Sequence, residues 1–257
     1  MGVRRTLLAA FLTLALLIAP NCYAARGFDT LGSSTTDQIT TSYTTGVSTT
    51  YSLSMWVWIK STGNNGFGYF FTQGGGFPQS TNAFMNMGNS TTTVGFGQVF
   101  STTSGSWTFS SAPFGAWQNI VITYDNSSTS NNPTVYVNGS SVSVTRSTAP
   151  VGTATRTAHS MAIGNSADSS HNAFDGKIAE FGWWNGAILT ANEAKSLANG
   201  VSPLKIRNAQ LSLYLPLYGL SSSEPDWGPS HSTQTVTGTA FANNPPTSGF
   251  PLLDYVR

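Results

Sequence analysis

The segment from Trp117 to Gly200 constrains the fold of this chain more than any other part of it. It begins with a hydrophobic hairpin, WQNIVITYDNSSTSNNPTVYVNGS, in which Asn138 and Gly139 are suited to the positive φ angles of a tight turn. A polar loop (IGNSADSSHNAFDG), a second strand (FDGKIAEFGWWN) and one short helix follow in that order. Short strands with a single helix predict an all-β protein built as a β-sandwich.

The clearest strand signal outside this segment is YSLSMWVWIK, at residues 51–60. Its side chains alternate between an aliphatic face and a face with two tryptophans, so we expect both faces to be at least partly covered. The aliphatic face carries Leu53, Met55, Val57 and Ile59, and the other face carries Ser54, Trp56, Trp58 and Lys60. Further along, Thr190 and Glu193 form a capping-box pattern, which predicts a helix over residues 191–198 that ends at Gly200.

The first 24 residues are typical of a cleavable secretory signal. Two arginines precede an apolar run at residues 7–19, and small residues near Ala24 suit a signal peptidase. A myristoylation pattern at Gly2 and a twin-arginine pattern at Arg4 and Arg5 are alternatives, but the apolar run and the cleavage site favour general secretion. We therefore predict a secreted protein, extracellular or periplasmic, with one domain over residues 25–257. No later segment is long and apolar enough to span a membrane.

Composition excludes several classes of function. Cys22 is the only cysteine and lies in the predicted signal, so the mature chain has no disulfide and no cysteine-based metal site. Charged residues are 8% of the chain, against about 25% in an average protein. Loss of Arg4 and Arg5 changes the formal charge from +1 to −1, which excludes a basic surface for nucleic acid. A surface rich in hydroxyls and amides suggests recognition of neutral sugars through hydrogen bonds.

The carboxylates do not form a catalytic pattern. Jelly-roll glucanases need two carboxylates on either side of one glycosidic bond, usually in a Glu-x-Asp-x-x-Glu pattern, and that pattern is absent. Glu180 is the only carboxylate in the middle of a clear strand, and no acid lies two residues to either side of it. The three histidines form neither an HxH nor an HExxH pair. We therefore predict a protein that is not an enzyme.

These segments resemble the laminin-G-like and pentraxin-like domains of the concanavalin A-like lectin/glucanase superfamily. The resemblance covers roughly residues 26–219, and its motifs are mainly structural. It implies a jelly-roll β-sandwich of two antiparallel sheets with one short helix, and non-enzymatic binding of glycans or other extracellular ligands, often with calcium. The motifs that carry it are SLSMWVWIK, WQNIVITYDN, TVYVNGS, IGNSADSS, FDGKIAEFGWWN and LTANEAKSLANG before LYLPLYG.

The resemblance also implies a possible calcium site in the polar loop. Asp168 falls where pentraxin-like domains have an aspartate ligand, Asn172 falls where they have an amide ligand, and Asp175 offers further oxygens. Ca²⁺ takes six to eight such oxygens. Ser166 stands where a glutamate is expected, which removes one charge. The alternative is that Asp168 and Asn165 form Asx turns and that Asp175 caps a bend before the next strand.

Two tryptophans are candidates for stacking on a sugar ring. Alternation in FDGKIAEFGWWN places Phe181 and Trp183 in the core with Ala179, and Trp184 on the other face with Ile178 and Glu180. Trp184 and, in the earlier strand, Trp58 therefore offer aromatic faces to a ligand. The alternative for both is packing beneath a loop or the helix.

The sequence thus predicts a secreted, non-catalytic binding domain with lectin-like recognition of carbohydrate. Its partner would be a glycan, and Ca²⁺ is the candidate cofactor. A structural or adhesive protein of a cell surface or virion, which binds a protein partner, is the alternative.

Overall fold

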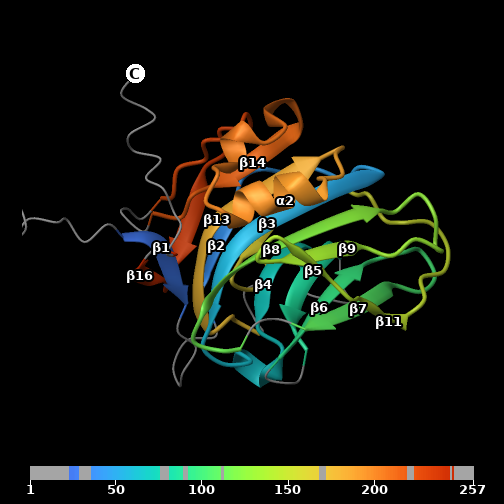
Figure 1. Ribbon diagram of the computed structural model, residues 1–257, viewed down its shortest axis with the longest axis horizontal. Helices are drawn as coiled ribbons and strands as arrows, with labels where there is room; N and C mark the ends of the chain where they lie inside the picture. Colours follow the sequence, from blue (N-terminus) through green and yellow to red (C-terminus); the bar gives the residue numbers. More distant parts are fainter. Residues whose placement is uncertain are drawn as a thin grey trace, which may run out of the picture.

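The computed structural model describes residues 23–28, 36–75, 81–88, 92–110, 113–167, 172–218, 223–243 and 245 of the 257. These residues form two eight-stranded sheets, and every pairing between the named strands is antiparallel (Figure 1). The prediction of an all-β jelly-roll sandwich with one short helix is confirmed.

The first sheet contains the segments that later form the candidate site. Its order is β10 (Ser140–Val142), β9 (Thr134–Val137), β8 (Trp117–Asp125), β3 (Thr50–Ile59), β13 (Gly176–Asn185), β1 (Tyr23–Phe28) and β16 (Ala240–Asn243), and β14 (Leu211–Leu215) also pairs with β13. The predicted cleavage after Ala24 falls near the start of β1. The cleavage itself stays a prediction.

The second sheet covers one face of the first. Its order is β11 (Thr145–Thr148), β7 (Gly105–Ser110), β6 (Thr93–Gln98), β5 (Thr81–Met87), β4 (Tyr69–Gly74), β12 (Met161–Ile163), β2 (Gln38–Thr41) and β15 (Gln234–Thr237). Three short 3-10 helices complete the described elements: η1 (Asn64–Gly66), η2 (Pro203–Lys205) and η3 (Asn208–Gln210).

The core lies between the two sheets, where the predicted aliphatic face of β3 is fully buried. Aromatic rings fill its centre, and Tyr51 stacks on Trp183 with ring centroids 4.9 Å apart. Burial of such rings stabilises the fold without disulfides. The opposite face of β3, with Trp56 and Trp58, points away from the second sheet, and we call this side of the first sheet its outer face.

A β-bulge at Glu180 changes the predicted alternation of β13. Ala179 pairs with Trp56 while Gly182 pairs with Ser54, so β13 has one more residue than β3 in this stretch, and Glu180 takes a φ of 54°. The extra residue places Ile178 in the core and Ala179 on the outer face beside Trp56. The prediction for these two residues was therefore wrong, whereas Phe181 and Trp183 are in the core as predicted.

Helix α2 (Ala191–Ala198) covers part of the outer face, as Figure 1 shows. Its bounds and its capping box are as predicted, with Thr190 accepting from the amide of Glu193 and the glutamate carboxylate accepting from the amide of Thr190. Ala194 and Leu197 pack into an apolar cluster on β8, β9, β13 and β14. Among the described residues, no helix has the length and apolarity that a membrane span requires.

Candidate functional site

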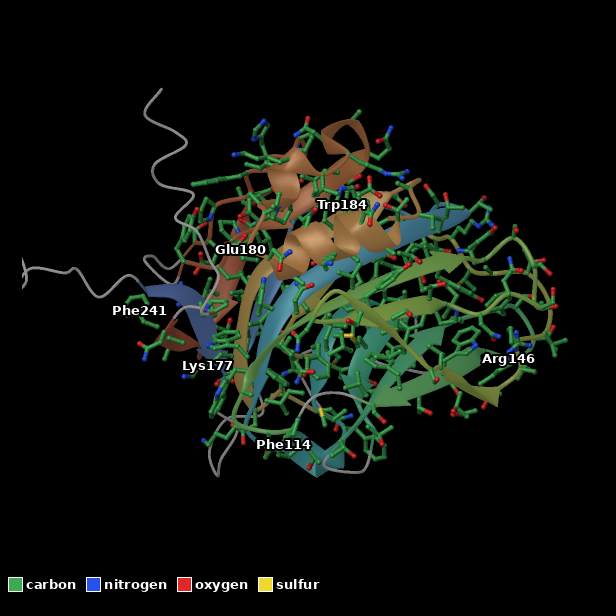
Figure 2. The ribbon with its side chains drawn as sticks, viewed as in Figure 1. Phe114, Arg146, Lys177, Glu180, Trp184 and Phe241 are labelled. Carbon is green, nitrogen blue, oxygen red and sulfur yellow. The ribbon has the colours of Figure 1, made fainter. Side chains whose placement is uncertain are left out.

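The outer face of the first sheet is open at the end away from α2. There it forms a groove of about 300 Å³ between β3, β13, β1 and β16. We call it the Trp58 groove. Its lining includes Gly27, Trp58, Lys60, Lys177, Ala240 and Phe241. Figure 2 shows Lys177 and Phe241 near each other at this end, whereas Trp184 lies by α2.

The register of four strands creates this hollow. Lys177 on β13 pairs with Trp58 on β3 and with Gly27 on β1, and Gly27 pairs with Ala240 on β16. Directly paired residues point to the same face of a sheet. The row therefore runs from a large ring through a long cationic side chain to a glycine and an alanine. The row thus has its smallest side chains at Gly27 and Ala240 and its largest at Trp58.

Trp58, one of the two predicted ligand-binding residues, is partly exposed at this groove. The ammonium Nζ of Lys177 lies 4.6 Å from the centroid of its ring. Such a cation–π contact contributes about 0.5–1 kcal/mol at an exposed position. Displacing the ammonium from the ring would therefore cost a ligand only about 0.5–1 kcal/mol of free energy.

Lys60, which lines the groove, forms an ion pair with the buried Asp175. The Lys60 Nζ lies 3.5 Å from Oδ1 of Asp175, the Lys60 side chain is 38% exposed, and the Asp175 side chain is fully buried. The backbone oxygen of Asp175 accepts from the amide of Lys60, which joins β13 to the end of β3. The negative charge is thus inside the protein and the positive charge is at the surface.

A second ion pair lies beside Phe241. Arg26 and Glu224 pair with each other and are both buried, and the Arg26 Cζ lies 5.6 Å from the centroid of the Phe241 ring. The ring itself is 57% exposed. The pair adds no net charge to the groove, but it supports the edge strand that carries Phe241.

The predicted calcium ligands are only partly within the described residues, and Asp168 lies outside them. Asn172 uses its Oδ1 to accept from the Asn65 side-chain amide, at 3.1 Å. Asp175 faces Lys60, and neither of its carboxylate oxygens accepts a hydrogen bond, so its side chain is not the cap that the alternative expected. Within the described part of the chain, no three His, Cys, Asp or Glu residues cluster to hold a metal. These residues alone do not fit a calcium site, and calcium binding stays a prediction.

Trp184, the other predicted ligand-binding residue, has no exposed surface. Its Nε1 donates to the backbone oxygen of Ile206 at 2.7 Å, and its ring packs in the same cluster as Leu197 of α2. The structure therefore shows packing beneath the helix, and a ligand has no access to this ring. The bulge keeps Trp184 on the outer face, but α2 covers that end of the face.

Glu180 is buried beside Tyr214 of β14 and is not among the residues that line the groove. Its Oε2 accepts from the Tyr214 hydroxyl at 2.6 Å. Burial raises the pKa of Glu180 to about 7, and the hydrogen bond from Tyr214 acts in the opposite direction. Burial also raises the pKa of Tyr218, and the nearby charges of Glu180 and Glu224 raise it further. These carboxylates are enclosed in protein and offer no acid–base pair to a bound glycan.

Sequence reasoning missed Lys60, Lys177 and Phe241 as members of a site. Alternation placed Lys60 on the same face as Trp58, which was a usable signal. For Lys177 and Phe241 no local pattern indicated a neighbour, because their proximity depends on pairing between strands that are far apart in the sequence.

Comparison with known proteins agrees with this architecture. A family model described as the concanavalin A-like lectin/glucanases superfamily matches residues 33–194, more than half of the chain. The chain belongs to this superfamily. The resemblance found in the sequence is thereby confirmed. Of the residues that line the groove, Trp58, Lys60 and Lys177 lie within the matched range. Gly27, Ala240 and Phe241 lie outside it.

Solved structures show the same lectin-like fold. One is the native heptameric SAP-like pentraxin from Limulus polyphemus, with 13% identity and a TM-score of 0.55, over 72% of this chain and 85% of that one. Another is a candidate carbohydrate-binding protein from Bacteroides ovatus, with 15% identity and a TM-score of 0.56, over 86% of this chain and 60% of that one. No curated protein matches the sequence. At these identities the likeness concerns the fold alone.

Proposed function

We propose that this member of the concanavalin A-like superfamily is a secreted, non-catalytic domain that binds carbohydrate in the Trp58 groove. The observation that carries the proposal is the partly exposed Trp58 ring beside a hollow with Gly27 and Ala240 at its other side. The C–H face of a sugar packs well on an aromatic ring. A cavity of about 300 Å³ is at the small end of ligand sites, which suits a short glycan segment.

The chemistry of the groove supports binding without turnover. A glycosidase needs two carboxylates about 5–9.5 Å apart, one on each side of the bond to be cleaved. Among the residues that the structure describes, those that line the Trp58 groove include no Asp or Glu. The nearby carboxylate of Asp175 is buried and faces Lys60, so it lacks access to a glycosidic oxygen.

The test is a glycan screen followed by calorimetry on the protein from Ala25 onward. Trp58→Ala is expected to weaken glycan binding by about tenfold or more, because a central tryptophan commonly contributes 2 kcal/mol or more to an interface. Phe67→Ala is the matched control, since it removes another exposed ring outside the groove. Unchanged affinity in Trp58→Ala, with both variants folded by thermal melting, would place the glycan elsewhere.

Calcium is a further part of the proposal, with Asp168, Asn172 and Asp175 as its candidate ligands, next to Gly176 of the groove. The test is calorimetric titration of calcium into the wild type and into Asp168→Ala. Heat of binding that disappears in the variant supports these ligands. No heat in the wild type removes calcium from the proposed function and leaves the glycan site as it is.

The second candidate is a structural or adhesive surface protein that binds a protein partner. It is favoured by one observation: Phe241 is 57% exposed on β16, an edge strand of the first sheet. If glycan screens are negative, and if Phe241→Ala abolishes binding of the protein to a cell-surface or virion protein, this candidate replaces the first.

A further inference from the structure

The two lysines at the Trp58 groove line it, whereas the carboxylate that pairs with one of them is buried. Lys60 and Lys177 line the groove, whereas the Asp175 side chain is fully buried behind it. The Arg26–Glu224 pair is buried as well. A ligand in the groove therefore meets ammonium groups, whereas the Asp175 carboxylate that balances the charge of Lys60 is beneath the surface.

Lys177 has no carboxylate to neutralise it among the described residues. Lys60 faces Asp175 and Arg26 pairs with Glu224, so the formal charges of these two pairs cancel. The contact found for the Lys177 ammonium is with the Trp58 ring. The ring face contacts one side of the ammonium, and the three N–H donors of the ammonium point in different directions. Donors remain for a ligand, and the groove carries a net positive charge.

The neighbours of Lys177 in the row determine from which side a ligand can reach its ammonium. Gly27, its neighbour on β1, has no side chain, and Ala240 beyond it has only a methyl group. The space beside Lys177 is therefore open on the β1 side, and on the β3 side the Lys177 ammonium lies over the Trp58 ring. A sugar in this space would have one substituent next to the ammonium, and its ring would meet Trp58 where Trp58 also lines the groove.

We propose that the Trp58 groove selects sugars that bear a carboxylate, with Lys177 binding that carboxylate and Trp58 contacting the sugar ring. This inference rests on the proposed function and names its ligand class. It replaces the expectation of neutral sugars, which followed from the low overall charge. Composition counts charges over the whole chain, whereas the sheet register gathers two lysines at one site.

The experiment compares sugar acids with their methyl esters, which differ in charge but hardly in shape. The probes are oligogalacturonic acid and N-acetylneuraminic acid, each with its methyl ester, titrated by calorimetry into the protein from Ala25 onward at low salt. We expect the acid of at least one pair to bind about threefold to tenfold more tightly than its ester, the range for partly exposed ion pairs and charge-assisted hydrogen bonds. The preference should shrink as salt is raised.

Variants separate the role of Lys177 from a general effect of charge. Lys177→Gln is expected to abolish the preference for the acid while ester binding persists, and Lys177→Arg is expected to retain the preference. The matched control is Lys195→Gln, which removes the same charge from the exposed side of α2, away from the groove. It should leave the preference unchanged.

The outcomes distinguish this inference from the function on which it rests. Equal binding of acid and ester, or binding of neutral glycans only, overturns the selection of carboxylates and leaves the glycan site in place if Trp58→Ala removes that binding. A preference that persists in Lys177→Gln overturns the role of Lys177. No binding of any acid, ester or neutral glycan overturns both proposals.

Discussion

Replacing Glu180 with glutamine is expected to make the protein more stable above pH 7 and to change its stability little at pH 4. The carboxyl is buried beside Tyr214 of β14, and burial raises its pKa from 4.5 to about 7, although the hydrogen bond from Tyr214 acts to lower it. Glutamine has nearly the same shape, accepts the same hydrogen bond through its oxygen, and never carries the charge that burial disfavours.

The sign and size of the effect follow from proton binding. Between pH 4.5 and pH 7 the unfolded chain has released the proton of Glu180 while the folded protein still holds it, so the free energy of unfolding falls as pH rises. The stabilisation is fully present below pH 4.5 and is lost as pH rises through about 7. The difference between the two pKa values corresponds to about 3 kcal/mol.

Urea denaturation at intervals from pH 4 to pH 8 measures this effect. The difference between the wild type and Glu180→Gln cancels the contributions of other titrating groups, provided that the denaturant slope is unchanged. The difference should grow by about 3 kcal/mol over this range. Parallel curves at all pH values would refute the reasoning. They would mean that the hydroxyl of Tyr214 stabilises the carboxylate enough to balance its burial.

Three other changes test neighbouring parts of the structure. Tyr214→Phe removes the donor to Glu180 and is expected to cost about 1–3 kcal/mol at pH 8 and less at pH 4, measured by the same denaturation series. Trp184→Phe leaves the Ile206 carbonyl beneath α2 without its indole donor. It should lower the free energy of unfolding by about 1–3 kcal/mol and leave ligand affinity unchanged. Loss of ligand binding with unchanged stability would contradict the burial of Trp184. Gly27→Leu should fill the Trp58 groove and block glycan binding in calorimetry while the melting temperature stays within a few degrees of wild type; unaltered binding would contradict the proposed position of the ligand.

Features set by neighbouring residues could be predicted from the sequence. The aliphatic face of β3 followed from simple alternation, and the tight turn predicted at Asn138 and Gly139 joins β9 to β10 with φ angles of 50° and 77°. The bounds of α2 followed from the capping box of Thr190 and Glu193. In each case the physical cause acts over a few residues, so the sequence pattern contains it.

The bulge at Glu180 could not be predicted by the same logic. Both Ile178 and Ala179 are apolar, so either can face the core, and alternation does not show where an extra residue is inserted. Nothing in the local sequence marks a glutamate for a φ of 54°, which glycine or asparagine adopts more easily. The inward direction of Phe181 and Trp183 was right because large aromatic side chains gain most from the space between the sheets.

The Trp58 groove was also beyond local prediction, since its members come from β1, β3, β13 and β16. Trp58 alone had a signal, because its strand pattern showed a second face with aromatic side chains. Trp184 had the same signal and proved to be buried. What separates the two residues is α2, which covers one end of the outer face and leaves the other open.

Gly27 indicates that the groove is more than a packing defect. A Cβ atom built at this position would have its nearest contacts at 3.7 Å, with the Ala240 oxygen and the Ala242 Cβ, which is ordinary van der Waals contact. Its φ lies outside the left-handed region, so the backbone does not require glycine there either. Since neither packing nor backbone geometry explains a glycine that weakens a strand, the remaining physical consequence is the open space beside Lys177 and Trp58. That space is what a sugar bound to Lys177 would occupy.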